Sequence, residues 1–369
     1  MHTDRGNQPD LLNTFNALVN SEQYDQADAF IQSVLQSQQL IQMPRSDALA
    51  FIYRIGYVYP EAVLSFITRY RRDIPKPYID CLRIATQHKP SNRIYNGADK
   101  LVSIKSALYQ KKYLKARWLL YRFYRSFGLL PIPLITNKRL SIGINYPLTQ
   151  CLSNSEGVTS IMTSYNSSKF IRQSLWGLMN QTIEQHEIIV VDDASTDDTK
   201  DIIEQEFPNV KLIKLTTNQG TYHARNVGAR AAKHRFITFQ DSDDWSHPQR
   251  LELQLENLIV NPDVIANFSK FFRVNVATGL PDARQLYPLM RLNLSSLMIR
   301  KTDFIHLGGF DASQRIESDK KFFELLKSEQ QKYHIIHKPL AVGSYRKNSL
   351  TTDSELGFNR YGFSKHRVF

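Results

Sequence analysis

Apolar residues recur at helical spacing through the first third of the chain. The segment 11–36, LLNTFNALVNSEQYDQADAFIQSVLQ, has them three and four positions apart, with one polar break. Similar spacing over 47–56 and 60–72 indicates a second helical pair, and residues 103–128 indicate a third. Because this period places the apolar side chains on one face of a helix, the pattern predicts an all-α domain over residues 1–130.

The helices carry a weak sign of an internal repeat. Tyr24 with Ala27, and Tyr113 with Ala116, form the same Tyr-x-x-Ala pattern after a short polar turn. This pattern resembles tetratricopeptide-type helical hairpins, but two matches set no fixed repeat period. We therefore favour a generic helical domain over a true repeat array.

The pattern changes at Val158, where apolar runs that end in polar loops begin to alternate with helical segments. The strand-like runs are VTSIMTSYN, HEIIVVDDASTDDT, VKLIKL and FITFQ. The helical segments between them are KFIRQSLWGLMNQT, DDTKDIIEQEF and GTYHARNVGARAAK. Such alternation predicts an α/β domain with a mostly parallel sheet over residues 158–369, preceded by a linker over 131–157.

Composition is that of a globular protein. The chain has 369 residues, 42% hydrophobic and 11% aromatic, which is enough for two or three domains with cores. Cys81 and Cys151 are its only cysteines, which excludes a disulfide framework and a cysteine-based zinc site. The polar start MHTDRGNQPD is unlike a signal peptide, and no apolar run reaches the roughly 18 residues of a spanning helix. We therefore expect a cytoplasmic protein.

The net charge of +12 belongs almost entirely to one stretch. Residues 1–99 hold 10 basic and 10 acidic residues, whereas residues 100–150 hold 10 basic residues and no acid. Within that stretch, residues 104–127 predict a basic amphipathic helix. One face would carry Ala107, Leu114, Trp118 and Tyr121, and another Lys105, Lys112, Lys115 and Arg122.

A basic helix with Trp and Tyr suits an anionic membrane surface, such as the inner face of the plasma membrane. A core-facing stripe with a solvated charged back explains the same pattern. The absence of any acid favours the membrane, since solvated faces usually mix the two signs. Nucleic acid is a third partner that such charge could serve, but no recognisable binding module supports it.

Three carboxylates directly follow the strand-like run FITFQ. They are Asp241, Asp243 and Asp244, with Ser242 between the first two. Carboxylates this close repel one another and raise each other's pKa, so the cluster is unfavourable unless a positive charge lies beside it. Mg²⁺ or Mn²⁺ fits, because such a cation takes one or two protein carboxylates and completes its shell with water and substrate phosphates. An acidic turn that caps the next helix is the simpler alternative.

Residues 158–255 resemble the nucleotide-binding half of the family 2 glycosyltransferases, and the likeness continues more loosely to about residue 352. It rests on the motifs TSYNSSKFIRQSLWGLMNQT, VVDDASTDDT, NQGTYHARNVGARAA and DSDD, which occur in the expected order. Thr163 replaces the usual proline before the first motif. The resemblance implies the GT-A fold, a Rossmann-like and mostly parallel sheet, as a catalytic domain preceded by the all-α domain.

The resemblance also implies where the donor nucleotide binds. Asp193 or its neighbour Asp192 would accept a hydrogen bond from uracil or another base. Arg225 would contact the base or a phosphate, and Arg346 a phosphate. The other positions that approach the donor are Ser164, Tyr165, Asn166, Asn218, Gly220 and Asp241. Many relatives carry a histidine where this chain has Asn348, so we expect no histidine metal ligand there.

The acidic motif and a later turn would supply the chemistry. The resemblance makes Asp243 a ligand of a metal that bridges the diphosphate, with Asp241 holding the ribose or assisting the metal. The stretch HLGGFDASQRIESDKKFFELL resembles the region that carries the base. Aligned on its helix, Asp319 is the base and Glu317 the second choice. A base opposite the leaving phosphate implies direct displacement with inversion.

These features lead us to expect an inverting, metal-dependent glycosyltransferase. It would move a sugar from a nucleoside diphosphate donor to a glycan or lipid-linked acceptor in surface polysaccharide synthesis. We expect the donor to be UDP-linked. A GT-A nucleotidyltransferase also gathers carboxylates around a metal, but TSYNSSKF lacks the basic, Gly-rich phosphate loop such enzymes carry. A non-catalytic sugar- or partner-binding module would have lost the Asp-x-Asp pair or the acidic base segment, and both are present.

Overall fold

The computed structural model describes most of the chain as two compact units. The described residues are 11–21, 23–37, 39–42, 45–69, 74–132, 135–136, 139–140, 156–282 and 286–346. The first unit runs up to Tyr95 and includes the described part of the short segment 283–288. The second unit holds residues 96–282 and 289–346. Each unit has its own core.

The first unit is all-α, as the apolar spacing predicts. Its helices are α1 (Leu11–Asn20), α2 (Tyr24–Gln36), α3 (Gln39–Gln42), α4 (Arg45–Ile55), α5 (Pro60–Arg69) and α6 (Lys76–Ala85). Phe15 of α1 packs edge-on against Phe51 of α4, with both rings buried and their centroids 5.7 Å apart. Tyr78 of α6 is also buried, and its hydroxyl donates to the Ile52 carbonyl at 2.7 Å. The apolar faces therefore form this unit's core.

Two helices that the sequence places in the all-α domain belong to the second unit. They are α7 (Lys100–Tyr109) and α8 (Tyr113–Ser126). The ring of Phe123 packs against that of Phe272, with centroids 5.9 Å apart, and Lys105 pairs with Asp282 at 3.4 Å. The units therefore divide at Tyr95 and not near residue 130. The sequence could not predict this boundary, because helical periodicity shows which face is apolar but not what that face packs against.

The faces assigned to residues 104–127 are also wrong in part. The chain turns at Lys111, whose φ is 58°, so the stretch forms two helices and not one. Ala107 and Lys105 are buried on α7 and belong to no exposed face. The exposed side of α8 instead gathers Leu114, Trp118 and Tyr121.

The predicted linker over 131–157 lies mostly outside the described residues. Its described part includes the paired strands β1 (Ile135–Thr136) and β2 (Arg139–Leu140). Among the described residues, no helix combines the length and the hydropathy that a bilayer span requires.

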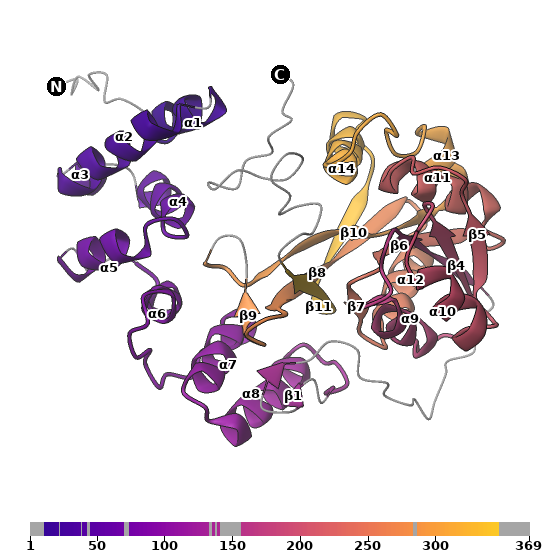
Figure 1. Ribbon diagram of the computed structural model, residues 1–369, viewed down its shortest axis with the longest axis horizontal. Helices are drawn as coiled ribbons and strands as arrows, with labels where there is room; N and C mark the ends of the chain where they lie inside the picture. The colour runs from indigo at the N-terminus through magenta and orange to yellow at the C-terminus, as the bar shows by residue number, and fades with distance from the viewer. Residues whose placement is uncertain are drawn as a thin grey trace. The chain divides into compact units, whose positions relative to one another are not determined.

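The second unit is built on a nine-stranded sheet (Figure 1). Its strands are β3 (Val158–Ser164), β4 (His186–Asp192), β5 (Lys211–Lys214), β6 (Phe236–Asp241), β7 (Trp245–Ser246), β8 (Ala266–Asn275), β9 (Pro281–Asp282), β10 (Met290–Arg300) and β11 (Tyr333–Tyr345). Their order is β5-β4-β3-β6-β10-β8-β11-β7, with β9 beside β8. Strands β5, β4, β3 and β6 are parallel, which confirms the prediction for this part of the chain. Beyond β6 the sheet is mixed, because β10 runs antiparallel to both its neighbours.

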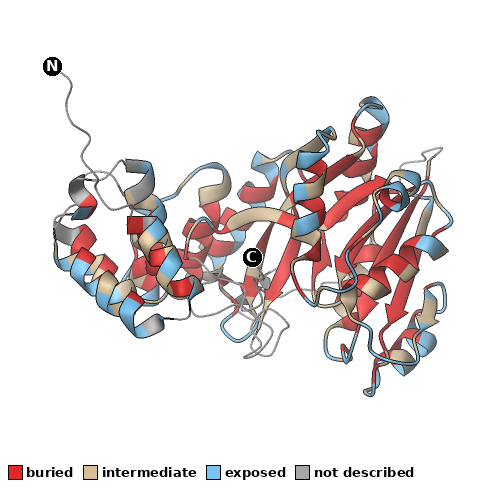
Figure 2. Ribbon diagram, turned by 90° about the horizontal axis from the view of Figure 1, so that it is seen from above, coloured by how far each residue is buried: buried red, intermediate tan, exposed pale blue. Residues whose placement is uncertain are grey.

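Helices pack on both faces of the parallel strands. The helices of this unit after α8 are α9 (Ile171–Met179), α10 (Thr199–Glu206), α11 (Thr221–Ala231), α12 (Arg250–Val260), α13 (Lys301–His306) and α14 (Ser318–Ser328). Adjacent residues on β3 point to opposite faces: Ile161 joins the core with α11, α13 and α14, and Met162 the core with α9 and α10. Figure 2 shows the strands of this sheet largely buried. Burial on both faces explains why they read as continuous apolar runs.

Candidate functional site

The carboxyl ends of the parallel strands bring several predicted residues to one edge of the sheet. Ser164, the last residue of β3, lies in register with Asp192, the last residue of β4. On the other side of β3, Thr163 lies in register with Asp241 at the end of β6. Ligands of such sheets bind beyond this edge, so the strand order alone places these side chains where a donor would bind.

Two buried carboxylates organise the loops at this edge. Asp192 accepts a hydrogen bond from the Ser164 hydroxyl at 3.2 Å. Asp193 accepts from the backbone N–H groups of Gln219 and Gly220, both at 2.8 Å. Gly220 has a φ of +90°, which glycine adopts readily, and it directly precedes α11. Asp192 also accepts from the Ser195 N–H at 2.9 Å and is fully buried, whereas Asp193 keeps a small exposed fraction and further lone pairs.

The remaining predicted donor-binding residues lie in the same group of loops. Asn166 accepts a hydrogen bond from the Thr196 N–H at 2.8 Å, which ties the loop after β3 to the loop after β4. Asn218, in the loop before α11, accepts from Arg315 at 3.1 Å. Tyr165 is exposed, so its ring is accessible to a ligand. The structure therefore brings together the residues of the first three motifs.

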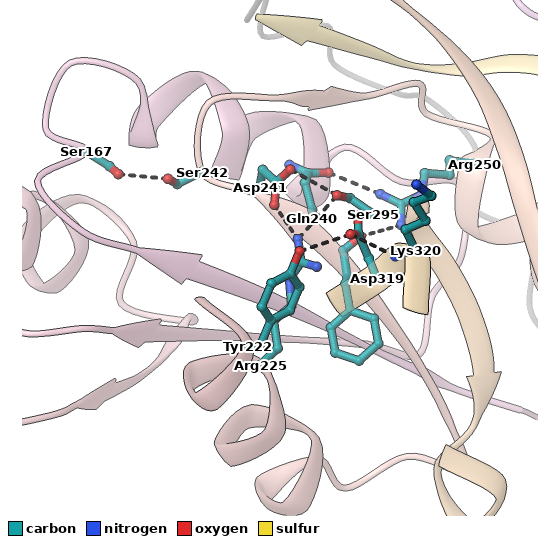
Figure 3. Close-up of polar contacts among 11 residues, drawn as sticks. Ser167, Tyr222, Arg225, Gln240, Asp241, Ser242, Arg250, Ser295, Asp319 and Lys320 are labelled. Carbon is teal, nitrogen blue, oxygen red and sulfur yellow. Dashed lines mark hydrogen bonds and ion pairs between the residues drawn. The ribbon is translucent and has the colours of Figure 1, made fainter. Parts of the chain in front are cut away.

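Arg225 of α11 joins the acidic motif to this edge (Figure 3). Its buried guanidinium pairs with the Asp241 carboxylate and donates to the Ser295 hydroxyl at 3.2 Å. Burial alone would lower the pKa of Arg225, but the attraction of Asp241 and other acidic groups outweighs it, and the pKa is raised. Nε and Nη1 are buried without a hydrogen-bond partner among the described residues, and the guanidinium lies near the rings of Tyr222, Phe239 and Phe310.

Ser295 and Arg250 complete the site. The sequence leaves Ser295 open between an acceptor-site and a structural role, and no role was predicted for Arg250. Ser295 of β10 donates to Asp241 at 3.0 Å, and no local signal could identify a partner 54 positions away. Arg250 is buried beneath the motif, where its guanidinium donates to Ser246 and Thr238 at 2.7 and 2.6 Å. Burial lowers the pKa of Arg250 to about 10. Arg250 stands on the apolar face of the segment HPQRLELQLE, and this position could have identified it. A basic side chain on an apolar helix face is expected to be buried, and a buried arginine nearly always has polar partners.

The rest of the acidic motif contacts the end of β11. Asp243 accepts a hydrogen bond from Arg346 Nε at 3.0 Å, and Asp244 accepts one from the Ser344 N–H at 3.0 Å. Burial raises the pKa of Asp243, although Arg346 opposes the shift. The pKa of Asp244 is raised well above its usual range by burial and by Asp243 and Asp241. The position of Asn348 lies outside the described residues.

These contacts bear on whether the motif fits a divalent metal. The described residues include no group of three or more His, Cys, Asp or Glu side chains arranged around a common metal position. Asp241 and Asp243 nevertheless offer hard oxygen donors, although Arg225 and Ser295 donate to Asp241 and Arg346 donates to Asp243. Such a pair matches Mg²⁺ or Mn²⁺ held by two protein carboxylates and substrate phosphates, and not an all-protein cage.

Of the two predicted base residues, the structure brings only Asp319 to this cluster (Figure 3). Its Oδ1 accepts hydrogen bonds from the Tyr222 hydroxyl and the Lys320 N–H, both at 2.9 Å. Burial raises the pKa of Asp319, and the nearby Arg225 opposes the shift. Glu317 has a left-handed backbone, with φ 65°, and pairs with Lys320 at 3.6 Å. Asp319 is therefore the better placed carboxylate.

Known proteins resemble this chain over the same region. The family profile described as Glycosyl transferase family 2 matches residues 159–342. An uncharacterized glycosyltransferase of Haemophilus influenzae is 30% identical over 211 residues, which covers 53% of this chain and 71% of that protein. The Escherichia coli UDP-Glc:alpha-D-GlcNAc-diphosphoundecaprenol beta-1,3-glucosyltransferase WfgD is 35% identical over 105 residues, covering 28% of this chain and 42% of that protein.

The match to several other relatives is also partial. A second uncharacterized glycosyltransferase of H. influenzae is covered over 43% of its own length. Among solved structures, S. aureus TarS 1–349 in complex with UDP-GlcNAc aligns with 24% identity and a TM-score of 0.44, covering 52% of this chain and 60% of that one. The motif order, the GT-A arrangement of the sheet, the profile match and the H. influenzae relative agree: the chain belongs to the family 2 glycosyltransferases.

Proposed function

We propose that this glycosyltransferase moves a sugar from a UDP-linked donor to a hydroxyl group of a glycan or lipid-linked acceptor in surface polysaccharide synthesis. One observation carries the proposal: Asp192, Asp193 and Asp241 gather at one sheet edge, and Asp319 lies close enough to Arg225 and Asp241 to interact electrostatically with both. The WfgD relative, which is named for a UDP-Glc donor and an undecaprenol-linked acceptor, supports the same classes of donor and acceptor.

The first part of the site would bind the nucleotide. Asp193, or Asp192 beside it, would accept the ring N–H of uracil with one of its remaining lone pairs. The loop of Ser164, Tyr165 and Asn166 would lie along the nucleoside, with the accessible Tyr165 ring beside it. Asn218 and Gly220 would close the opposite side. Each residue lies on a loop that the buried carboxylates already fix, so little ordering is needed on binding.

The second part would bind the diphosphate. Asp243 and Asp241 would hold Mn²⁺ or Mg²⁺, which when bound offsets the negative charge of the leaving nucleoside diphosphate. Arg346, whose Nε donates to Asp243 at 3.0 Å, lies beside the acidic motif and would contact a phosphate there. Arg225 has unsatisfied donors and would hold the donor near Asp241. The guanidinium groups would thus share the positive charge that the acidic motif requires.

Asp319 would act as the base. Its carboxylate would take the proton of the acceptor hydroxyl while the acceptor oxygen bonds to the anomeric carbon and the bond to the leaving phosphate oxygen breaks. Because burial raises the pKa of Asp319, it is a stronger base than an exposed aspartate. A single displacement of this kind inverts the configuration at the anomeric carbon.

Calorimetric binding of UDP, GDP and dTDP in Mn²⁺, in Mg²⁺ and in EDTA tests this proposal. We expect UDP to bind best and its affinity to fall when the metal is removed. Asp243→Asn should lose the metal-dependent part of the affinity. The matched control is Asp263→Asn, since Asp263 is an exposed residue paired with Lys332 away from the motif. Equal UDP affinity with EDTA and with metal, or an unchanged UDP affinity in Asp243→Asn, would contradict the proposed metal site. Failure of every nucleotide to bind would refute the donor site.

A further inference from the structure

Helix α8 presents three large apolar side chains to solvent. Leu114, Trp118 and Tyr121 have exposed fractions of 81%, 46% and 54%. They are spaced by four and three residues, so they lie on one face of the helix. A surface helix of a folded protein normally carries polar side chains on this side. The outer face of α8 is therefore apolar from Leu114 to Tyr121, where an ordinary solvated face is not, and the exposed Arg125 continues this face in the last turn.

The core of the second unit does not account for this apolar face. The opposite side of α8 already supplies that core, through the buried side chains of Ala116, Leu119, Leu120, Phe123 and Tyr124. The exposed triplet, Leu114, Trp118 and Tyr121, thus adds apolar surface that folding of the unit does not require. Apolar surface of this kind commonly marks an interaction site.

Basic side chains flank the exposed triplet. On a helical projection of 100° per residue, Arg117 lies on one side of it and Lys115 and Arg122 on the other. The Arg122 guanidinium lies over the Trp118 ring, 4.9 Å from its centroid. No acidic residue occurs between residues 100 and 150, so α8 itself carries no carboxylate beside Arg117 and Arg122. The charge around the triplet is complementary to an anionic surface.

Contacts fix α8 to the segment that follows the acidic motif. The Tyr124 ring packs against His247, with centroids 5.2 Å apart. His247 Nε2 lies 2.9 Å from the Leu130 carbonyl oxygen, and the Leu130 N–H donates to Gln249 at 2.8 Å. Since His247 is three residues beyond Asp244, α8 is joined closely to the loop that carries the proposed metal ligands. A surface bound by α8 would hold the site at a fixed distance from it.

We infer that α8 docks this protein on a bilayer surface that contains anionic lipid. Leu114, Trp118 and Tyr121 enter the boundary between headgroups and acyl chains, and the flanking basic residues contact the lipid phosphates. This arrangement is that of a helix lying in the interface, with apolar residues inward and Lys or Arg beside them. Anionic headgroups attract each such cation. Docking goes beyond the proposed transfer reaction, because none of these side chains belongs to the donor site.

Vesicle co-sedimentation of the full chain tests this inference, using phosphatidylcholine vesicles with and without phosphatidylglycerol. We expect at least about tenfold tighter binding to the anionic vesicles, weakened by salt. The triple variant Leu114→Ser, Trp118→Ser, Tyr121→Ser should lose at least about tenfold of that binding. The matched control is Ile259→Ser with Val260→Ser, which removes exposed apolar residues of α12 instead.

Tryptophan fluorescence gives an independent readout of insertion. Anionic vesicles should shift the emission of the wild-type protein to shorter wavelength, and Trp118→Phe should abolish the shift while sedimentation persists. Wild-type protein that binds both vesicle types equally, or a triple variant that binds as wild type, would overturn the inference. A third result would also overturn it: the wild type is a dimer that binds no lipid, and the triple variant is a monomer. The triplet would then serve self-association. Thermal unfolding confirms that each variant is folded.

Discussion

Replacing Asp319 by asparagine removes the proposed base while preserving its contacts. Asp319 Oδ1 accepts from the Tyr222 hydroxyl and the Lys320 N–H, and the amide oxygen of asparagine can accept both. What the variant cannot do is take the proton of the acceptor hydroxyl. General bases contribute about 10²–10⁴ in rate. We therefore expect kcat to fall by that factor, which is about 3–5 kcal/mol of activation free energy at about 1.36 kcal/mol per decade.

Steady-state transfer at saturating donor measures this loss, and calorimetry measures donor affinity in the same variant. Donor affinity should stay within about threefold of wild type, because the loss concerns the reacting proton and not uniform binding. Glu317→Gln is the matched control: it removes a neighbouring carboxylate that pairs with Lys320 and does not reach the cluster. A kcat loss of this size in Glu317→Gln, with Asp319→Asn near wild type, would refute the assignment.

The pH profile tests the same assignment without removing the carboxylate. Burial raises the pKa of Asp319, so activity should fall, as pH decreases, at a higher pH than for an exposed aspartate. The Tyr222 hydroxyl lowers that pKa by donating a hydrogen bond to the carboxylate. Tyr222→Phe should therefore move the acid limb of the profile upward. An acid limb that stays in place in Tyr222→Phe would show that another group controls it.

Three further predictions concern stability. Burial lowers the pKa of His247 to about 4, whereas the unfolded value is about 6.5. The stability that the neutral side chain contributes above the unfolded pKa is therefore lost as pH falls. In urea unfolding, the wild type should lose about 2 kcal/mol more than His247→Gln between pH 8 and 5. Ser295→Ala should cost about 1.5–3 kcal/mol in the same assay, because the Asp241–Arg225 pair loses a bridging hydroxyl. Gly228→Ala should cost about 1–3 kcal/mol and lower Tm, since its Cβ would lie 2.5 Å from a methyl group of Ile161. Unchanged stability in any one would contradict the packing or charge described there.

The parallel half of the sheet could be predicted because its signal is local. Strands buried on both faces read as apolar runs, and β4, with the sequence HEIIVVD, is one of them. Polar residues directly after such runs must then meet at one edge, which is where Ser164, Asp192 and Asp241 lie. The order of strands from β10 onward was not predicted, since antiparallel pairing between distant strands leaves no periodic trace.

The charge pairs of the site could not be predicted for a related reason. Arg225 and Asp241 belong to two separate motifs, and only the packing of α11 against β3 and β4 brings them together. Over residues 104–127 the periodicity predicts one amphipathic helix where the structure has two, and the sequence does not state which apolar face of α8 packs inward. Ala116 and Leu120 are buried, whereas Leu114 remains exposed. The choice depends on the complementary surface around Phe272, far along the chain.

The stereochemical course of donor turnover tests the central claim most directly. Proton NMR of the full chain with UDP-glucose and Mn²⁺ would identify the first anomer formed, either by hydrolysis or by transfer to an added acceptor. The account predicts that the α-linked donor yields the β anomer first, and that Asp319→Asn and Asp243→Asn each abolish its formation. An α anomer formed first would contradict single displacement by a base at Asp319, and unimpaired turnover by both variants would contradict the site itself.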